Sequence, residues 1–266
     1  MGRIESKFRT LRSRGECALI PFFTAGDPDL ETSERMIDAL EKAGADAIEI
    51  GIPFSDPMAE GPTIQRASER ALRAGASLRR VLELVRKVRG RVDLPLILMG
   101  YANNFFAMGA DGFARAAQEV GVDGVIVVDL PPEEDPEFYT AVREAGIDPI
   151  LLASPTTTPK RAKMLCAETR GFLYYVSRTG VTGARAELGG DVESAVKALR
   201  EFADVPICVG FGVSTPEHAR SVAAFADGVV VGSALVDRIE HADSPDDAIF
   251  SAAAFVAELK APLRRS

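Results

Sequence analysis

Two carboxylates in the stretch ADAIEIGIPFSDPMAEGPTIQ (residues 45–65) have the type and spacing for acid–base chemistry. The first, Glu49, lies in a run that reads as a buried strand. Successive side chains of a strand point to opposite faces, so Glu49 shares a face with Ala47 and Gly51, opposite the isoleucines. No lysine or arginine is near in sequence, so burial should raise the pKa of Glu49 above about 4.3, as general acid–base catalysis requires. The alternative is that Glu49 pairs with a residue distant in sequence and only stabilises the strand.

The second carboxylate, Glu60, follows in the loop IPFSDPMAEGP, eleven residues after Glu49. Its three prolines and its glycine end the strand and shape a loop. A carboxylate on a rigid strand and another on a loop can differ enough in pKa to serve as acid and base. Taken alone, Glu60 would more commonly be a solvated loop charge.

Eight apolar runs that alternate with helical patterns predict the elements that position these groups. Several of the runs are nearly continuous in valine and isoleucine, as in a parallel sheet covered on its outside. The runs span residues 17–23, 45–52, 94–100, 124–129, 147–153, 172–177, 205–212 and 227–233.

The count of eight favours a barrel over an open sheet, and the turn TAGDPD after the first run lacks the glycine spacing of a dinucleotide-binding sheet. We therefore expect an α/β fold, a (β/α)8 TIM barrel with an extra N-terminal helix and additional short helices. Residues 1–266 should form a single domain, since no linker or change of composition interrupts them. Asp27 and Pro28 are predicted to start the first helix after the first strand, with Asp27 as its N-cap.

Composition excludes several classes of function. The net charge of −8 argues against a nucleic-acid or anionic membrane partner, and no run approaches the length of a membrane span. The N-terminus has no apolar stretch, so no signal peptide is expected and a cytoplasmic location is predicted. Three widely spaced cysteines suit a reducing compartment, and the two histidines lie far from any cysteine cluster, so no metal site is expected.

Active sites of such barrels lie at the carboxyl ends of the strands. At the predicted strand ends this chain has three aromatic residues and a third carboxylate. Phe22, Tyr101 and Tyr174 suit a flat apolar ligand, although each could equally be part of the core. Asp129, beside two prolines, could be a hydrogen-bond acceptor that orients a loop as readily as a catalyst, and we favour the supporting role.

Glycines at the ends of the last two strands predict a phosphate site. Gly212, Gly232 and Ser233 stand where these barrels often bind phosphate through backbone N–H groups or a helix N-terminus. The long loop at 177–191 carries Thr182 and Gly183 and suits a lid over the substrate, unless it is a disordered insertion. The residues alone thus indicate an acid–base enzyme acting on a phosphorylated small molecule with an apolar ring.

Six stretches, in order along residues 1–260, closely resemble the tryptophan synthase alpha chain family. They are EIGIPFSDPMAEGPTIQ, YANNFF, VVDLPPEE, SRTGVTGA, GFGVS and VGSALV, of which the first and fourth are highly specific. The resemblance implies retro-aldol cleavage of indole-3-glycerol phosphate to indole and glyceraldehyde 3-phosphate. It implies no cofactor in this chain and a partner beta chain that carries pyridoxal phosphate in an alpha2beta2 assembly.

The resemblance also assigns roles to residues. Glu49 would protonate indole C3 and help to deprotonate the glycerol hydroxyl, and the loop carboxylate Glu60 would stabilise charge at the indole N–H. The substrate-binding residues would be Phe22, Tyr101 and Tyr174 around the indole, Gly183, Gly212, Gly232 and Ser233 at the phosphate, and Thr182 and Asp129 between lid and barrel. Pro53, Asp56 and Met58 would face the beta chain.

One position departs from the family pattern, which has aspartate where this chain has Glu60. The extra methylene adds about 1.5 Å of reach, and misplacement on that scale can lower a rate by roughly 10²-fold. The departure leaves a second hypothesis, a catalytically weakened barrel that binds ligand and regulates a beta chain. A third hypothesis is another phosphate-binding barrel enzyme, but such enzymes usually need a lysine or a second acid on other strand ends.

Overall fold

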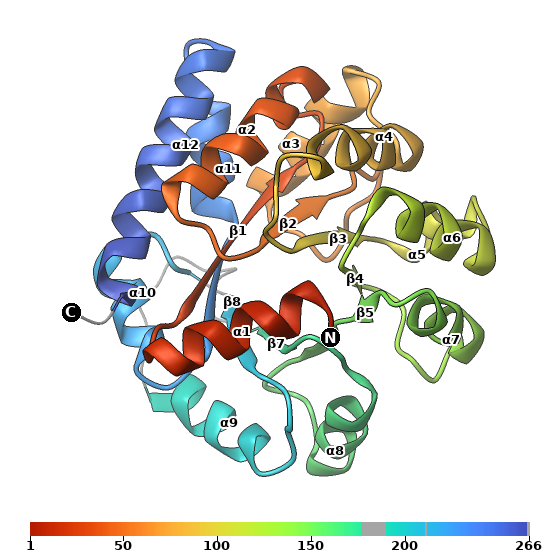
Figure 1. Ribbon diagram of the computed structural model, residues 1–266, viewed down its shortest axis with the longest axis vertical. Coiled ribbons are helices and arrows are strands. Elements are labelled where there is room, and N and C mark those ends of the chain that lie inside the picture. Colours follow the sequence, from red (N-terminus) through yellow and green to blue (C-terminus); the bar gives the residue numbers. More distant parts are fainter. Residues whose placement is uncertain (177–189, 211, 265–266) are drawn as a thin grey trace.

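The computed structural model describes residues 1–176, 190–210 and 212–264. Within these residues, nine strands pair in parallel in the order β5-β4-β3-β2-β1-β9-β8-β7-β6 (Figure 1). Their bounds are β1 (Ala18–Thr24), β2 (Ile48–Gly51), β3 (Leu96–Gly100), β4 (Gly124–Val127), β5 (Asp148–Pro149), β6 (Leu151–Ala153), β7 (Leu173–Val176), β8 (Ile207–Gly210) and β9 (Gly228–Val231).

The two ends of this sheet, β5 and β6, are consecutive in the chain and close the ring. Only Ile150 separates them, and its backbone N–H donates to the carbonyl of Val125 on β4 at 2.9 Å. The two short strands therefore act as one barrel strand, which pairs with β4 at its start and with β7 at its end. The predicted (β/α)8 barrel is confirmed.

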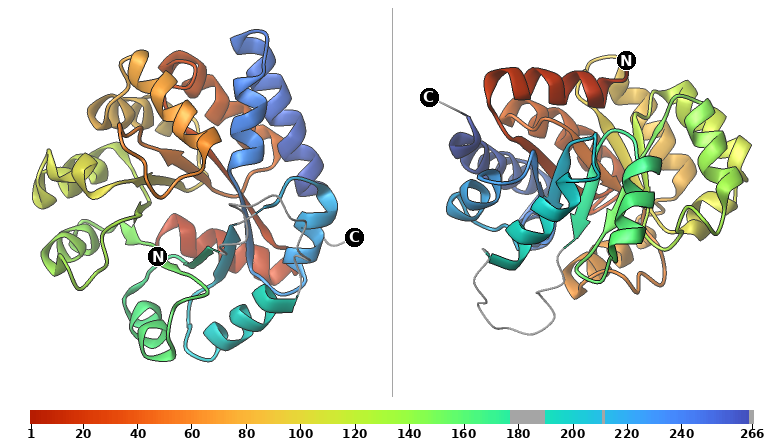
Figure 2. Two further views of the ribbon diagram at one scale, coloured as in Figure 1. Left: turned by 180° about the vertical axis from the view of Figure 1, so that it is seen from behind. Right: turned by 90° about the horizontal axis from the view of Figure 1, so that it is seen from below.

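Helices surround the ring on the outside, and α1 lies across one end of it (Figures 1 and 2). The predicted N-terminal helix and the additional short helices are both present. The bounds are α1 (Arg3–Arg14), α2 (Leu30–Ala43), α3 (Pro62–Arg73), α4 (Leu78–Arg89), α5 (Ala102–Phe106), α6 (Ala110–Val120), α7 (Pro136–Glu144), α8 (Pro159–Glu168), α9 (Gly190–Arg200), α10 (Pro216–Ala223), α11 (Ser233–Glu240) and α12 (Pro245–Lys260), followed by the 3-10 turn Ala261–Leu263. None of the helices in the described ranges is long and apolar enough to cross a membrane.

The buried side chains form one layer outside the strands and another inside the barrel. Ile48 and Ile50 of β2 belong to the outer layer, which packs against the helices. Ala47 belongs to the inner layer, together with Ile97 and Ile126 of the neighbouring strands. Because side chains alternate along β2, Glu49 points into the barrel, as the sequence predicted.

The prediction for the start of α2 was wrong. The N-cap is Asp29, whose carboxylate accepts from the Thr32 N–H at 2.7 Å. Asp27 is instead buried in a turn with a cis peptide bond to Pro28, and its carboxylate accepts two hydrogen bonds from Arg70. The ion pair with a distant helix competes with capping for this carboxylate, and a local pattern cannot reveal such a partner.

Candidate active site

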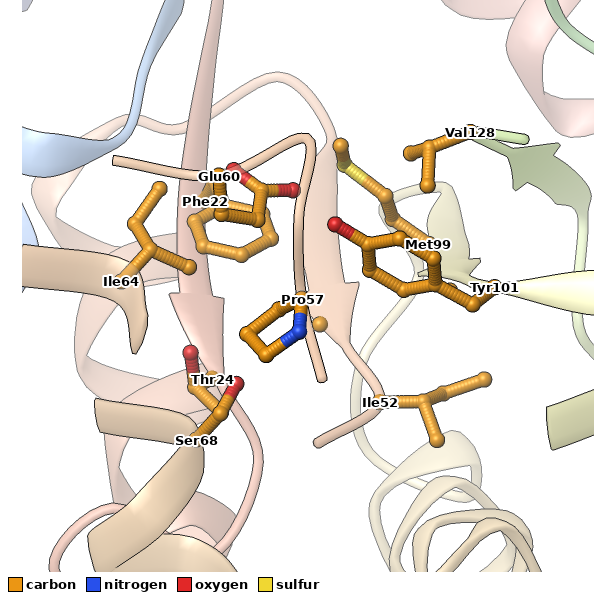
Figure 3. A pocket seen from close by; sticks show the side chains of 12 residues that line it. Phe22, Thr24, Ile52, Pro57, Glu60, Ile64, Ser68, Met99, Tyr101 and Val128 are labelled. Atoms are coloured by element: carbon orange, nitrogen blue, oxygen red, sulfur yellow. The ribbon is translucent and has the colours of Figure 1, made fainter. Parts of the chain in front are cut away.

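A pocket opens at the carboxyl ends of β1, β2 and β3, under the loop that carries Glu60 (Figure 3). The space between its lining side chains amounts to about 280 Å³, open solvent included. One side is formed by Phe22 and Ile64 and the other by Met99 and Tyr101 (Figure 3). The complete lining is Phe22, Thr24, Gly51, Ile52, Pro57, Glu60, Ile64, Ser68, Met99, Gly100, Tyr101 and Val128.

Glu49 lies in the barrel interior beside this pocket and is completely buried, with 0% of its surface exposed. It stands between Phe22 of β1 and Ile97 of β3 in the strand register. Neither carboxyl oxygen has a hydrogen-bond partner among the described residues. Burial, and secondly the charge of Glu60, raise the pKa of Glu49 from 4.5 to about 8. The predicted unpaired carboxyl of raised pKa is confirmed, and the purely structural ion pair is not found in the described part of the chain.

The side chain of Glu60 reaches into the pocket and is not a solvated loop charge. A turn places it there, since the Glu60 N–H donates to the Pro57 carbonyl at 3.0 Å. The amide of Gln65 on α3 then donates to the Glu60 carbonyl at 2.9 Å. Burial raises the pKa of the Glu60 carboxyl to about 7. Both carboxyl groups therefore have raised pKa values, and the charge of Glu60 contributes to that of Glu49, as expected of an acid and a base in one site.

Tyr101 and Phe22 shape the two walls of the pocket. The Tyr101 ring stacks on Phe54 with centroids 4.9 Å apart, and its hydroxyl accepts from the Ala59 N–H at 2.9 Å. Phe22 packs with Ala67 of α3 and Val236 of α11. Both rings are thus held in place from outside the pocket and present fixed apolar surfaces to a ligand.

Tyr174 is buried at the barrel centre rather than on the pocket wall. It fits there because residue 210 is glycine: a Cβ at Gly210 would lie 2.1 Å from the Tyr174 hydroxyl oxygen. Burial, and then the charges of Glu49 and Glu60, raise the pKa of Tyr174 well above its ordinary value. Its phenol is therefore a neutral neighbour of both carboxyl groups.

The predicted phosphate residues occupy two adjacent strand ends. Gly212 follows β8 with φ +62°, a conformation that favours glycine. Gly232 follows β9 and precedes Ser233, the first residue of α11. The first N–H groups of a helix have no acceptor inside the helix, so this end of α11 can receive an anion. Thr182 and Gly183 lie outside the described residues.

Asp129 has the loop-orienting contact that its position suggested. Its carboxylate accepts from the N–H of Ala102, at the start of α5, at 2.7 Å. It does not line the pocket. The contact ties the end of β4 to the helix that follows β3.

The pocket also includes side chains that sequence reasoning missed, above all Thr24, Ile64 and Ser68. Ile64 and Ser68 are four residues apart on α3 and so share one face of the helix. The Thr24 hydroxyl is buried without a hydrogen-bond partner in the described ranges. Met99 and Val128 were missed because they continue apolar runs that read as core.

Possible metal ligands gather away from the pocket, at the carboxyl end of α11. The ligand atoms of Asp237, Glu240 and His241 lie within 4.8 Å of one another. Glu240 is already bound by the guanidinium groups of Arg66 and Arg70. We therefore assign no metal to this group.

The loop predicted to face a partner is partly exposed at the pocket's rim. Pro53 is buried and its carbonyl accepts from the Asn104 amide at 3.2 Å, whereas Asp56 is exposed. Met58 has 82% of its surface exposed, and Phe106 on α5 is another exposed apolar side chain.

A closed (β/α)8 barrel with two carboxyl groups of raised pKa around an apolar pocket defines a barrel enzyme of the acid–base class. Comparison with known proteins gives the particular family. The profile described as tryptophan synthase alpha chain matches residues 8–264, and the chain belongs to this family.

Relatives and solved structures agree over nearly the whole chain. The tryptophan synthase alpha chain of Geotalea uraniireducens (strain Rf4) is 52% identical over 264 residues, covering 99% of this chain and 98% of that one. The tryptophan synthase subunit alpha of Legionella pneumophila str. Paris has 40% identity and a TM-score of 0.92, covering 99% and 98%. A Mycobacterium tuberculosis tryptophan synthase structure in an open form has 33% identity and a TM-score of 0.89, covering 99% of both chains.

Proposed function

We propose that this chain is the alpha subunit that cleaves indole-3-glycerol phosphate to indole and glyceraldehyde 3-phosphate, and that Glu49 carries the chemistry. The observation behind this assignment is the completely buried carboxyl of Glu49, which has no hydrogen-bond partner among the described residues and whose pKa of about 8 leaves it largely protonated at neutral pH. A protonated acid beside an aromatic pocket is what a ring carbon needs in order to become a leaving group.

In the proposed reaction, Glu49 donates its proton to C3 of the indole and leaves a positive charge on the ring nitrogen. The bond from C3 to the glycerol chain then breaks, and its electron pair returns to the ring as indole forms. The adjacent glycerol hydroxyl loses its proton to the ionised Glu49, and its oxygen becomes the carbonyl of glyceraldehyde 3-phosphate. Glu49 ends protonated, so no water, oxidant or cofactor is consumed.

Glu60 is proposed as the second catalytic group, accepting the ring N–H and offsetting the charge that develops there. Its support is the position of its side chain in the pocket wall and a pKa near 7, which leaves a large ionised fraction at neutral pH. The neighbouring Glu49 is protonated under these conditions, so the two groups need not carry like charges at the same time.

Other residues are proposed to bind the indole ring and the phosphate of the substrate. Phe22 and Tyr101 on the pocket walls would border the indole, with Tyr174 as their neighbour at the barrel centre. Backbone N–H groups at Gly212, Gly232 and Ser233 would bind the phosphate, helped by the start of α11. Gly183 would complete the phosphate site, and Thr182 would join the lid to Asp129. We assign these roles by family resemblance together with the positions of the residues that the structure describes.

We further propose a beta chain as partner, with pyridoxal phosphate bound in the beta chain and an alpha2beta2 assembly. The exposed Met58 and Asp56, on the loop that begins at Pro53, would contact it. We also propose a cytoplasmic location, as suits a biosynthetic enzyme of this kind. Residues 1–266 are proposed to form one barrel domain.

The test is indole release by the purified chain from indole-3-glycerol phosphate, with and without a beta chain. We expect slow release alone, stimulation by the beta chain, and one glyceraldehyde 3-phosphate for each indole. Normal binding of the substrate and stimulation of the beta chain without any indole would contradict the proposal and support the regulatory subunit instead.

A further inference from the structure

A charge network outside the pocket joins three chain segments through one guanidinium group, that of Arg70 on α3. Its Nε and one terminal nitrogen donate to the two carboxylate oxygens of Asp27 at 2.7 and 2.8 Å. Its other terminal nitrogen donates to Glu240, at the end of α11, at 2.9 Å. Arg66, one turn earlier on α3, binds both oxygens of Glu240 at 2.6 and 2.7 Å.

The network is largely shielded from solvent at its centre. Asp27 has 2% of its surface exposed, and the side chains of Arg70 and Glu240 are exposed by 27% and 17%. A two-pronged guanidinium contact of this kind fixes direction as well as distance, which a lysine ammonium cannot do. Within this cluster, the relative positions of the three segments are therefore closely defined.

Two of the joined segments continue directly into the pocket, and the third, α11, begins at the proposed phosphate site. Asp27 follows β1, which carries Phe22 and Thr24, and α3 begins at Pro62, two residues after Glu60. The third segment, α11, starts at Ser233. Between the two helices, Phe22 packs with one residue from each of them, Ala67 and Val236.

We infer that Arg70 is a positioning residue, which sets the spacing of α3 and α11 and thereby places the Glu60 carboxylate relative to the phosphate-binding end of α11. Arg70 touches no reacting atom. Its effect passes through the two helices and through the Phe22 ring held between them. This inference rests on the proposed function, because the distance that matters is the one between the indole and the phosphate of a single substrate.

The test compares two variants. Arg70→Lys keeps the charge but loses the two-pronged guanidinium contact, and Glu240→Gln weakens only the link between α3 and α11. The matched control is Arg73→Met, on the same helix, since Arg73 has 77% of its side chain exposed and pairs only with Glu69 among the described residues. We expect kcat for indole release to fall about tenfold and KM to rise in both test variants, and to stay unchanged in the control.

A second measurement separates positioning from simple stability and from the proposed function. Calorimetry with an indole-alkyl phosphate that lacks the hydroxyl groups measures binding without cleavage. We expect its affinity to fall about tenfold in both test variants at temperatures well below their Tm. Wild-type kcat, KM and affinity in Arg70→Lys and Glu240→Gln, whatever their Tm, would overturn the inference. Absence of indole release by the wild type would refute the proposed function, while weakened binding in the variants would still support positioning.

Discussion

The hydroxyl of Tyr101 accepts a hydrogen bond of 2.9 Å from the backbone N–H of Ala59, the residue immediately before Glu60. Tyr101 directly follows β3, so a rigid strand end holds the loop that carries the second carboxylate. The side-chain amide of Gln65 on α3 holds the same loop from the opposite side by donating to the backbone carbonyl of Glu60. The loop is thus fixed to both walls of the pocket.

Removing the Tyr101 hydroxyl should slow catalysis more than it weakens substrate binding. Tyr101→Phe keeps the ring stacked on Phe54 but loses a bond worth about 1 kcal/mol, which corresponds to roughly a fivefold lower kcat. KM should change less. Steady-state indole release measures both constants, with Tyr175→Phe as the control because Tyr175 lies in the outer core. An unchanged kcat would mean that the loop is held in place without this bond.

Glu60→Asp should lower activity in this chain, although aspartate is the family's usual residue. The loop backbone is fixed by Tyr101 and Gln65, so it cannot readily follow a side chain that is about 1.5 Å shorter. Misplacement on this scale predicts a loss of roughly ten- to a hundredfold in kcat. The measurement is indole release at saturating substrate. A faster Glu60→Asp enzyme would show that the loop adjusts and that glutamate is a handicap.

The pH dependence of kcat/KM should be bell-shaped. The active form has Glu49 protonated and Glu60 ionised, so activity falls below about pH 7 as Glu60 gains a proton and above about pH 8 as Glu49 loses one. In Glu60→Gln the acidic limb should disappear. The alkaline limb should also move to lower pH, because the charge of Glu60 contributes to the raised pKa of Glu49. Activity that keeps rising above pH 8 in the wild type would instead identify ionised Glu49 as the active form.

The same burial should make Glu49 a pH-dependent cost to stability. Its folded pKa of about 8 exceeds its ordinary value of 4.5, so Glu49 costs no stability through ionisation below about pH 4.5, and the protein loses stability as pH rises from there to about 8. Glu49→Gln removes this loss, so the Tm of the variant minus that of the wild type should grow between pH 5 and 8. Thermal unfolding at several pH values measures it, with the exposed Glu258→Gln as control. A difference in Tm that does not vary with pH would contradict the raised pKa of Glu49.

Local pattern was enough to predict the barrel and the environment of Glu49. The alternation of Ile48, Glu49 and Ile50 assigns opposite faces, and it holds because a strand has a fixed period of two. Eight apolar runs then predict the ring, and the strand ends locate the pocket.

Contacts between segments distant in sequence could not be predicted in the same way. Asp27 resembled a helix cap because its partner, Arg70, is forty-three residues away. Ile64 and Ser68 belong to the pocket only through the rotation of α3 about its axis, which depends on packing against α11 and β1. The inward direction of Glu60 likewise comes from a turn held by Tyr101 and Gln65.

The most direct test of the account is the rate of indole release by Glu49→Gln at saturating indole-3-glycerol phosphate, with a beta chain present. Glutamine keeps the size of the side chain but has no carboxyl proton to donate. We predict a loss of roughly 10²- to 10⁴-fold in kcat, with substrate still bound. A Glu49→Gln enzyme within a few-fold of the wild-type kcat would show that another group transfers the proton and would contradict the central claim.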